Sequence, residues 1–427
     1  MLSKEDNELI TRVSRGTPMG DALRRYWIPA LLSEELRGPD SDPLRVRLLG
    51  EDLVAFRDTN GQVGLIQNNC PHRGASLFFG RNEEAGIRCV YHGWKFDVTG
   101  QCVDMPNEPA ESNFKNKVKA TAYPCREVAG VIWTYMGPAH RQPPVPNYVW
   151  MRAPEGYRHI SKTYEACNFV QAIEGGVDTS HSSFLHRSMD RPEQMVEYQR
   201  YRRVSTAPTL EVLNTDYGYT YAGLRPIDGG KENYVRAYQF IMPFQQLRSN
   251  SGGRAGRATM AGHLWVPIDD EHTWTYNYFC SRTLDGPTYT REQIDAAETG
   301  AGRGPGDLIP GTYRLIRNQA NDWLIDRQAM REKRSYTGIE RLNTQDFAVQ
   351  ESMGAIYDRS TEHLGSADLA VIAMRKLLLD AANAIKQGLD PLGWDNGSSA
   401  NVRPAEGVLP AGAKWEKELE QELVAAW

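Results

Sequence analysis

Four potential metal ligands lie close together in the first quarter of the chain. Cys70 and His72 form a Cys-x-His pair, and sixteen residues later Cys89 and His92 form a Cys-x-x-His pair. Each pair is short enough to lie at the tip of a loop, so two loops could close on one metal centre from two sides. A glycine follows each pair within two residues, and its backbone can approach a metal cluster closely and donate N–H groups to it.

Two thiolates and two imidazoles are the ligands of a Rieske [2Fe–2S] cluster, in which two histidines replace two cysteines on one iron. Zinc is an alternative, although a zinc finger pairs cysteine with cysteine and histidine with histidine at short spacing. A further alternative is that the four residues are unrelated members of the core. Their concentration within residues 70–92 disfavours this alternative. The pattern therefore favours the iron–sulfur cluster.

A second group of ligands follows in the larger half of the chain. Asp178 and His181 are three residues apart and would share one face of a helix. His181 and His186 are five apart, roughly 140° on a regular helix, so they can bind one ion only if the helix ends or widens between them. With a carboxylate from elsewhere, the two imidazoles would complete the facial triad of a non-haem Fe(II) oxygenase. Taken alone, the histidines fit a solvated or capping role equally well.

The two patterns together strongly resemble the catalytic subunit of the Rieske non-haem iron oxygenases, and most of all the phthalate 4,5-dioxygenase branch. The resemblance covers essentially the whole chain. It implies that the cluster ligands are Cys70, His72, Cys89 and His92, and that two iron ligands are His181 and His186.

The resemblance also assigns two aspartates. Asp178 matches the family's bridging aspartate, which links an iron-ligand histidine to a cluster histidine of the neighbouring subunit. In related enzymes a D-x-x-x-x-E pattern on a late helix supplies the third iron ligand, and here Asp346 to Glu351 fits it. Asp346 is therefore the expected ligand. Asp358 is its competitor, and we interpret it instead as a salt-bridge partner.

The resemblance implies that electrons pass from the cluster to the mononuclear iron, where O₂ attacks an aromatic substrate. We expect cis-dihydroxylation, but related enzymes perform monohydroxylation or O-demethylation with the same ligands, so these stay open. A Rieske electron-transfer protein without its own oxygenation chemistry, and a zinc-binding structural protein, are further alternatives. No dinucleotide fingerprint is present, so a separate NADH-dependent reductase is expected. The bridging aspartate implies a homotrimer or stacked trimers, that is, a hexamer.

The phthalate-like branch acts largely on aromatic carboxylates, and a carboxylate is best bound by arginine. The sequence assigns none of the candidates to a site, and Arg236 is distinguished only by alternation with aromatic residues on a predicted strand. The candidates are Arg202, Arg203, Arg225, Arg236 and Arg248.

Bulk properties narrow the class of protein. The formal net charge of −5 over 427 residues gives no general attraction to nucleic acid or to an anionic membrane. No apolar run approaches the length of about 18 residues that spans a bilayer. The first residues are acidic, unlike a signal peptide, and we expect a cytoplasmic protein. We expect ordinary buried thiols at the other four cysteines, Cys102, Cys125, Cys167 and Cys280.

The expected fold class is α+β, with a small cluster domain followed by a larger catalytic domain. Residues 1–30 are predicted to be a helical lead-in. Short strands then predict a small all-β cluster domain, at 44–49, 53–57, 63–66 and 131–136. A proline-rich connector at 138–146 places the boundary between domains 1–145 and 146–427.

The larger domain is predicted to be an antiparallel sheet flanked by helices. Residues 367–386 are helical by composition. The strand-like runs are 217–224, 234–242, 262–266 and 273–280, and the last two are joined by a predicted hairpin turn. The glycine-rich residues 300–306 are interpreted as a loop.

Overall fold

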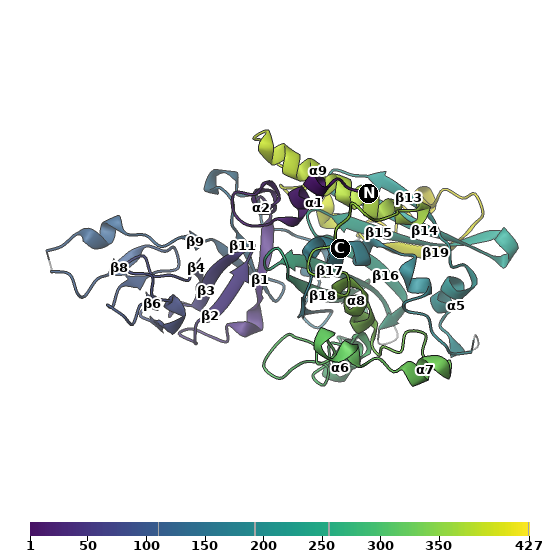
Figure 1. Ribbon diagram of the computed structural model, residues 1–427, viewed down its shortest axis with the longest axis horizontal. Helices are drawn as coiled ribbons and strands as arrows, with labels where there is room; N and C mark the ends of the chain where they lie inside the picture. The colour runs from purple at the N-terminus through teal and green to yellow at the C-terminus, as the bar shows by residue number, and fades with distance from the viewer. Residues whose placement is uncertain (110, 192–193, 255–256, 426) are drawn as a thin grey trace. The chain divides into compact units, whose positions relative to one another are not determined.

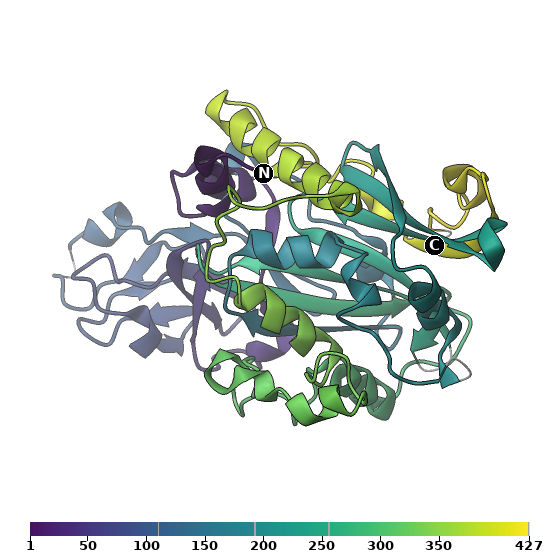
Figure 2. The ribbon, with the colours of Figure 1, turned by 45° about the vertical axis from the view of Figure 1, so that its right-hand side comes forward.

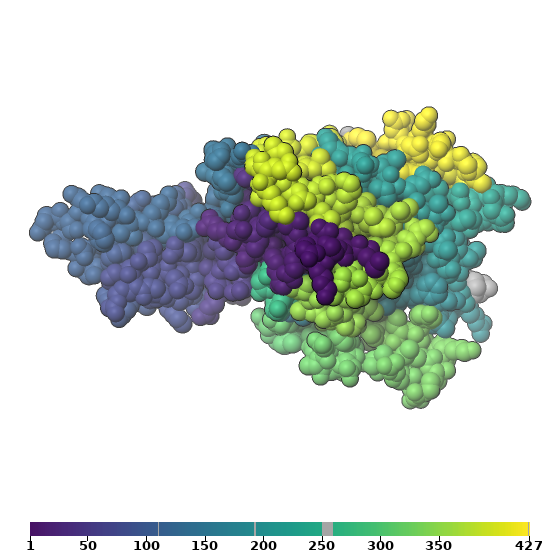
Figure 3. Space-filling model, turned by 45° about the horizontal axis from the view of Figure 1, so that its top comes forward, coloured from purple at the N-terminus to yellow at the C-terminus, as the bar shows by residue number. Residues whose placement is uncertain are grey.

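The computed structural model describes the chain except at residues 110, 192–193, 255–256 and 426 (Figure 1). It divides into two compact units, one of Val13–Val145 and one of Met1–Arg12 together with Pro146–Trp427. The first twelve residues, which the sequence predicts to belong to the cluster domain, pack into the larger unit instead. The reason is local: helix α1 (Lys4–Thr11) lies against the long helix α9 (Leu369–Lys386), as Figure 3 shows in purple and yellow-green.

The described residues of the smaller unit form three antiparallel sheets. Their strand orders are β1-β11-β10, β2-β3-β4-β9 and β5-β6-β7-β8. The strands are β1 (Trp27–Leu32), β2 (Leu44–Leu48), β3 (Glu51–Arg57), β4 (Val63–Gln67), β5 (Arg81–Glu83), β6 (Gly86–Arg88), β7 (Lys95–Phe96), β8 (Cys102–Asp104), β9 (Ala122–Tyr123), β10 (Cys125–Val128) and β11 (Val131–Tyr135). The small all-β domain predicted from the sequence is confirmed.

Two segments at the start of this unit differ in type. Helix α2 (Pro18–Leu23) begins as predicted, because the Thr17 hydroxyl accepts the Gly20 N–H and proline occupies the first turn. The prediction of helix up to residue 30 is wrong, since Trp27–Leu32 is strand β1. All six of its residues are buried, and five of them pair with β11, with a shift of register between Pro29 and Leu31. An apolar run without polar positions gives no helical period.

One hydrophobic core of the smaller unit includes both cysteines of the predicted cluster motif. Cys70 and Cys89 are nearly inaccessible to solvent and pack among large apolar side chains. The surrounding core residues include Val54, Phe56, Ile66, Leu77, Ile87, Trp94 and Phe96. The sheets thereby fix the backbone on which the two Cys-His loops stand.

The larger unit is built on one antiparallel sheet in the order β12-β18-β17-β16-β15-β14-β13, with β19 also paired to β15. The strands are β12 (Arg158–Glu165), β13 (Thr209–Asn214), β14 (Gly218–Ile227), β15 (Glu232–Ile241), β16 (Gln245–Arg254), β17 (Arg257–Pro267), β18 (Thr273–Ser281) and β19 (Ala405–Pro410). The four strand-like runs and the hairpin between β17 and β18 are confirmed, and the α+β class is confirmed with them.

Helices cover this sheet. In Figure 2, α4 (Phe169–Val177) and α8 (Leu342–Glu351) lie side by side in front of it, and α9 packs on β13 and β14. The other helices of this unit are α3 (Val149–Arg152), α5 (Glu197–Val204), α6 (Arg291–Ala301), α7 (Arg327–Arg331) and α10 (Trp415–Glu418). Within the described residues, no helix is long and apolar enough to cross a membrane.

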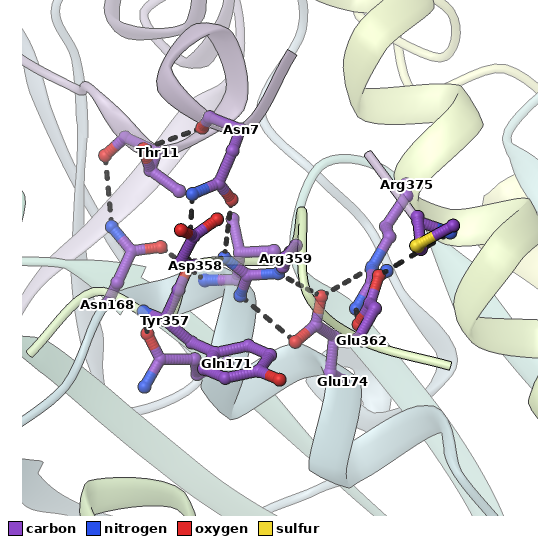
Figure 4. Close-up of polar contacts among 12 residues, drawn as sticks. Asn7, Thr11, Asn168, Gln171, Glu174, Tyr357, Asp358, Arg359, Glu362 and Arg375 are labelled. Carbon is purple, nitrogen blue, oxygen red and sulfur yellow. Dashed lines mark hydrogen bonds and ion pairs between the residues drawn. The ribbon is translucent and has the colours of Figure 1, made fainter. Parts of the chain in front are cut away.

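A buried polar network holds α4 in place (Figure 4). The Arg359 guanidinium, with 0% of its side chain exposed, donates to both carboxylate oxygens of Glu174 on α4, at 2.7 and 3.0 Å. It also donates to Oδ1 of Asn7 on α1, at 2.9 Å. The Asn168 side chain caps the start of α4 and donates to the Thr11 carbonyl. Helix α1 is thus tied to the helix that precedes the predicted iron ligands.

Candidate active site

The two Cys-His loops of the smaller unit have the same backbone structure. In each loop the cysteine N–H donates to the carbonyl five residues later at 2.8 Å, and a glycine N–H donates back to the cysteine carbonyl at 2.9 Å. Both glycines have positive φ, 77° and 80°, which favours glycine over any other residue. The residues are Cys70, Gly74 and Ala75 in the first loop and Cys89, Gly93 and Trp94 in the second. The histidine is the second residue after the cysteine in one loop and the third in the other.

The side chains of these loops converge. The rings of His72 and His92 lie 4.4 Å apart between centroids, edge to face, and Trp94 stacks on His72. The Nδ1 atoms of both histidines are buried and have no hydrogen-bond partner among the described residues. Burial, together with the neighbouring Cys89, raises the pKa of the Cys70 thiol to about 11. Two thiols and two unpartnered ring nitrogens in one place fit a [2Fe–2S] cluster, whose binding would displace the thiol protons.

The second ligand group begins where α4 ends. Asp178 follows the last helical residue, and its Oδ1 accepts the Ser180 N–H at 2.7 Å. Its Oδ2 accepts the backbone N–H of His181 at 3.1 Å and lies 3.2 Å from Nδ1 of that ring. His181 lies in a single 3₁₀ turn, His181–Ser183, so the helix has ended before either histidine. Because of their five-residue spacing, His181 and His186 could bind one ion only if the helix ended or widened between them, and here it ends before both.

His181, His186 and Asp346 meet at one point. The Asp346 Oδ1 atom lies 3.0 Å from Nε2 of His186 and 3.7 Å from Nε2 of His181. One ligand atom from each residue lies within 4.8 Å of the others. Two imidazoles and one carboxylate converging in this way can bind a divalent metal ion on one face and leave its other positions open.

The histidines and carboxylates of this second ligand group shift one another's pKa values. Burial raises the pKa of Asp346, but the His186 and His181 rings outweigh it, and the pKa is lowered overall. Burial likewise opposes ionisation of Asp178, and the hydrogen bond from His181 lowers its pKa. Burial lowers the pKa of His181, but Asp178 outweighs it and raises that pKa. Both carboxylates are thus kept ionised next to the two imidazoles.

A cavity of 360 Å³ opens beside these three residues and is lined by them. Of the five candidate arginines, three line this cavity: Arg202, Arg236 and Arg248. Arg225 is buried elsewhere and donates to Ser183 and to backbone carbonyls, while Arg203 is exposed on α5.

Arg202 and Arg236 differ in their partners. Arg236 lies 3.6 Å from Glu406, and its guanidinium lies over the Tyr238 ring at 5.2 Å. Arg202 lies over the Tyr198 ring at 4.9 Å and forms no ion pair within the described part of the chain. Burial lowers the pKa of Arg202, and repulsion from Arg236 adds to this. A cation in these surroundings favours an anionic ligand in the cavity.

Comparison with known proteins agrees with this geometry. Residues 26–124 match the Rieske [2Fe-2S] domain family, and residues 134–426 match the family described as LigXa C-terminal domain like. The oxygenase subunit of phthalate 4,5-dioxygenase from Pseudomonas putida is 41% identical over 92% of this chain and 89% of that protein. The chain belongs to the Rieske non-haem iron oxygenases.

Other relatives of this Rieske oxygenase differ in the reaction that their names give. The 3-chlorobenzoate-3,4-dioxygenase oxygenase subunit of Comamonas testosteroni is 37% identical over 99% of both chains. The 5,5'-dehydrodivanillate O-demethylase oxygenase subunit of Sphingobium sp. is 31% identical over 92% of this chain and 83% of that protein. Among solved structures, Pseudomonas putida CBB5 NdmA shares the fold, with a TM-score of 0.60 and 20% identity over 91% of this chain and 98% of that one.

The Rieske oxygenase therefore uses a [2Fe–2S] cluster and a mononuclear iron, and the residues described above fit both groups. Asp358, the competitor for the third ligand, is held elsewhere. Its Oδ1 accepts the Ser360 N–H and hydroxyl at 2.9 and 2.6 Å, and no ion pair of Asp358 occurs among the residues that the structure describes. Of the other cysteines, Cys125 is half-buried and the remaining three are buried.

Two features of the oxygenase site were not predicted from the sequence. Gln345, the residue before Asp346, contacts His186, and only its place beside a predicted ligand could have drawn attention to it. Gly175 and Gly176 let α4 approach its neighbours: a Cβ on Gly175 would lie 1.8 Å from Nε2 of Gln350, and one on Gly176 2.0 Å from Cη2 of Trp265. Adjacent glycines in a helix were the only sequence signal.

Proposed function

We propose that this oxygenase adds both atoms of O₂ to the ring of an aromatic carboxylate, of the phthalate type, and forms a cis-dihydrodiol. One observation carries the proposal: the cavity beside His181, His186 and Asp346 is lined by three arginines. A ring with one or two carboxylates needs cations at one end of its pocket and the reactive centre at the other. The names of the phthalate and chlorobenzoate relatives support this substrate class.

The ligand assignments belong to the same proposal. Cys70, His72, Cys89 and His92 bind the cluster, and His181, His186 and Asp346 bind the iron, supported by the convergence of each set. When bound, the two groups supply electron storage and the reduction of O₂. The chain's own residues do the rest. Contacts from Asp178 and Gln345 orient the His181 and His186 rings, and the cavity holds the substrate away from bulk water.

Electrons come from a separate NADH-dependent reductase. A solved structure of the same fold is titled as a complex of oxygenase and ferredoxin of carbazole 1,9a-dioxygenase, so a ferredoxin is the alternative donor to test. We propose a homotrimer or stacked trimers in which Asp178 links His181 to a cluster histidine of the neighbouring subunit. D178N should then leave both metal sites filled while slowing electron transfer, and an active monomer in analytical ultracentrifugation would contradict the assembly.

The test is product analysis with the purified holoenzyme, a reductase, NADH and isotopically labelled O₂, with phthalate as substrate. A cis-dihydrodiol that carries label at both hydroxyls, formed in equal amounts with NADH and O₂ consumed, supports the proposal. A single labelled hydroxyl, or formaldehyde release from a methoxylated aromatic acid, would favour the second candidate, monooxygenation or O-demethylation. We retain this second candidate because one relative, 31% identical to this chain, is named as an O-demethylase.

A further inference from the structure

A buried acid lies behind the wall of the catalytic cavity. Glu165, the last residue of β12, has 0% of its side chain exposed and forms no ion pair with any residue that the structure describes. Its Oε2 accepts the hydroxyl of Thr275 at 2.8 Å, and its Oε1 accepts the Cys167 thiol at 3.5 Å. Thr275 lies on β18 and lines the cavity. One hydroxyl therefore separates the acid from the space in which O₂ reacts.

We propose that Glu165 supplies protons to the catalytic cavity through the hydroxyl of Thr275. The inference rests on the oxygenase reaction proposed above but not on which product forms. Ring dihydroxylation consumes O₂, two electrons and two protons, and monooxygenation consumes the same and releases one water. In the transfer, the Thr275 hydroxyl first turns its proton from Oε2 of Glu165 toward an oxygen acceptor in the cavity. As Thr275 gives up this proton, the neutral Glu165 carboxyl donates its own proton to Oγ1 of Thr275. Glu165 is left as a carboxylate, which solvent reprotonates.

The surroundings keep Glu165 neutral at rest. Burial, together with the nearby carboxylates of Glu351 and Asp346, raises its pKa to about 8. The charged and titratable groups that act on this site are Glu351 and Asp346 from α8, Cys167, Arg314 beside Glu351, and Arg359 near Cys167. Within the described part of the chain, neither Arg314 nor Arg359 forms a hydrogen bond or ion pair with the Glu165 carboxyl. An acid of this kind holds a proton near neutral pH and can release it when an acceptor forms.

Glu351 marks the route from solvent. It ends α8, its Oε1 accepts the N–H of Ala166 next to Glu165 at 3.0 Å, and 7% of the residue is exposed. The repulsion between the two carboxyls makes double ionisation unfavourable, so a proton lost by Glu165 is replaced readily from the Glu351 side. Residue Gln350, next to Glu351, lines the cavity as well. In the proposed route, protons therefore enter near Glu351 at the end of α8 and reach the cavity through Glu165 and Thr275.

The test compares E165Q, T275V and T275S in the holoenzyme, with T163V as the matched control. Thr163 is a buried threonine on β12 that contacts the Thr275 carbonyl and Asn277 but not Glu165. We expect E165Q and T275V to lower product formation on the order of 10- to 100-fold and to divert O₂ to hydrogen peroxide. T275S, which keeps the hydroxyl, should restore the rate, and T163V should leave it unchanged. In the wild-type enzyme, the rate of product formation should fall as the pH rises above the Glu165 pKa of about 8. The rate of E165Q should not show this fall.

Infrared spectroscopy gives a readout that does not depend on turnover. The oxidised wild-type protein at pH 7 should show the carbonyl band of a buried protonated carboxyl, which E165Q removes. Iron content and circular dichroism report folding, and if E165Q does not fold, the contrast between T275V and T275S decides. Equal losses in T163V and T275V, an unchanged rate and pH profile in T275V, or the absence of the infrared band would overturn the proposal. A product other than the dihydrodiol, with these effects intact, overturns only the proposed reaction.

Discussion

Gln345 Oε1 lies 2.8 Å from Nδ1 of His186, and this contact fixes the tautomer of the ring. The Gln345 amide nitrogen donates to the Ile339 carbonyl at 2.8 Å and to the Thr337 hydroxyl at 3.2 Å, so Oε1 is the atom left to accept. Nδ1 of His186 therefore donates to Gln345, and Nε2 is the ring atom that faces Asp346. The residue beside one predicted iron ligand thus orients another.

Replacing Gln345 should weaken iron binding without unfolding the protein. Q345L removes the acceptor and frees the His186 ring, and we expect iron affinity to fall on the order of 10- to 100-fold. Q345E keeps an acceptor at the same position and should retain more iron than Q345L. The measurement is the iron content of each variant after dialysis against a graded chelator, with cluster absorbance as the internal reference. Equal iron loss in both variants would show that the acceptor has no role.

The neighbouring arginines of α5 form a matched pair for substrate binding. Arg202 lines the cavity, whereas Arg203 is exposed and donates to the Asp190 carbonyl. A hydrogen-bonded charge pair contributes about 1.5–3 kcal/mol, so R202Q should raise the KM for a carboxylated aromatic substrate on the order of 10- to 100-fold. R203Q should leave KM unchanged. The comparison is made by steady-state kinetics with a carboxylate and its uncharged amide. The same KM change for both substrates would point to lost packing instead of lost charge.

The sequence was most informative where the chemistry is local. Each Cys-His pair lies within four residues, so its type and spacing could be interpreted without the fold. Asp346 is far from His181 and His186 along the chain, and only the family resemblance selected it. The resemblance led us to expect an arginine at the site, but which arginines face the cavity depends on the sheet and on α5.

Contacts between distant elements could not be predicted. Glu165 meets Thr275 only because β12 pairs with β18, and no local pattern encodes that register. Strand β1 was missed for a different reason: a short, wholly apolar run fits a buried strand and a buried helix equally well. Its pairing with β11, which lies much later in the chain, decides between them.

The close approach of α4 to β17 gives a prediction about Gly176. An alanine Cβ there would lie 2.0 Å from Cη2 and 2.2 Å from Cζ2 of the buried Trp265 ring. We expect G176A to destabilise the protein by about 1–3 kcal/mol through overpacking and to displace the turn that carries His181. Iron content and the midpoint of urea unfolding measure the two effects.

Alanine substitutions at two other helical glycines serve as controls that distinguish overpacking from the general effect of alanine on helix stability. At Gly175 the clash is with the end of the Gln350 side chain, which can move, so G175A should cost less stability than G176A. At Gly300 in α6 nothing lies within 4 Å of the added Cβ, and G300A should stabilise by up to about 1 kcal/mol through helix propensity. Equal midpoints for G176A and G300A would show that α4 has room to move.

The ion pair between Glu298 and Arg303 predicts a pH dependence of stability in the larger unit. Burial raises the pKa of Glu298, but its contacts with Arg303 at 2.8 and 3.1 Å outweigh it and hold the pKa at about 2. The carboxyl is therefore ionised more readily in the folded than in the unfolded chain, where its pKa is near the usual 4.5. Its stabilisation, roughly 3 kcal/mol, is present in full above pH 4.5 and is lost as the pH falls toward 2.

E298Q tests this linkage. At pH 7 the variant should unfold at lower urea concentration than wild type, because Arg303 is left buried with one fewer charged partner. The difference between the two proteins should narrow as the pH falls from 5 toward 2. D295N, on the same helix, replaces an exposed carboxylate paired with Arg291 and should change the midpoint little at any pH. A gap between E298Q and wild type that stays constant with pH would mean that packing or hydrogen bonding, and not the charge of Glu298, stabilises this end of α6.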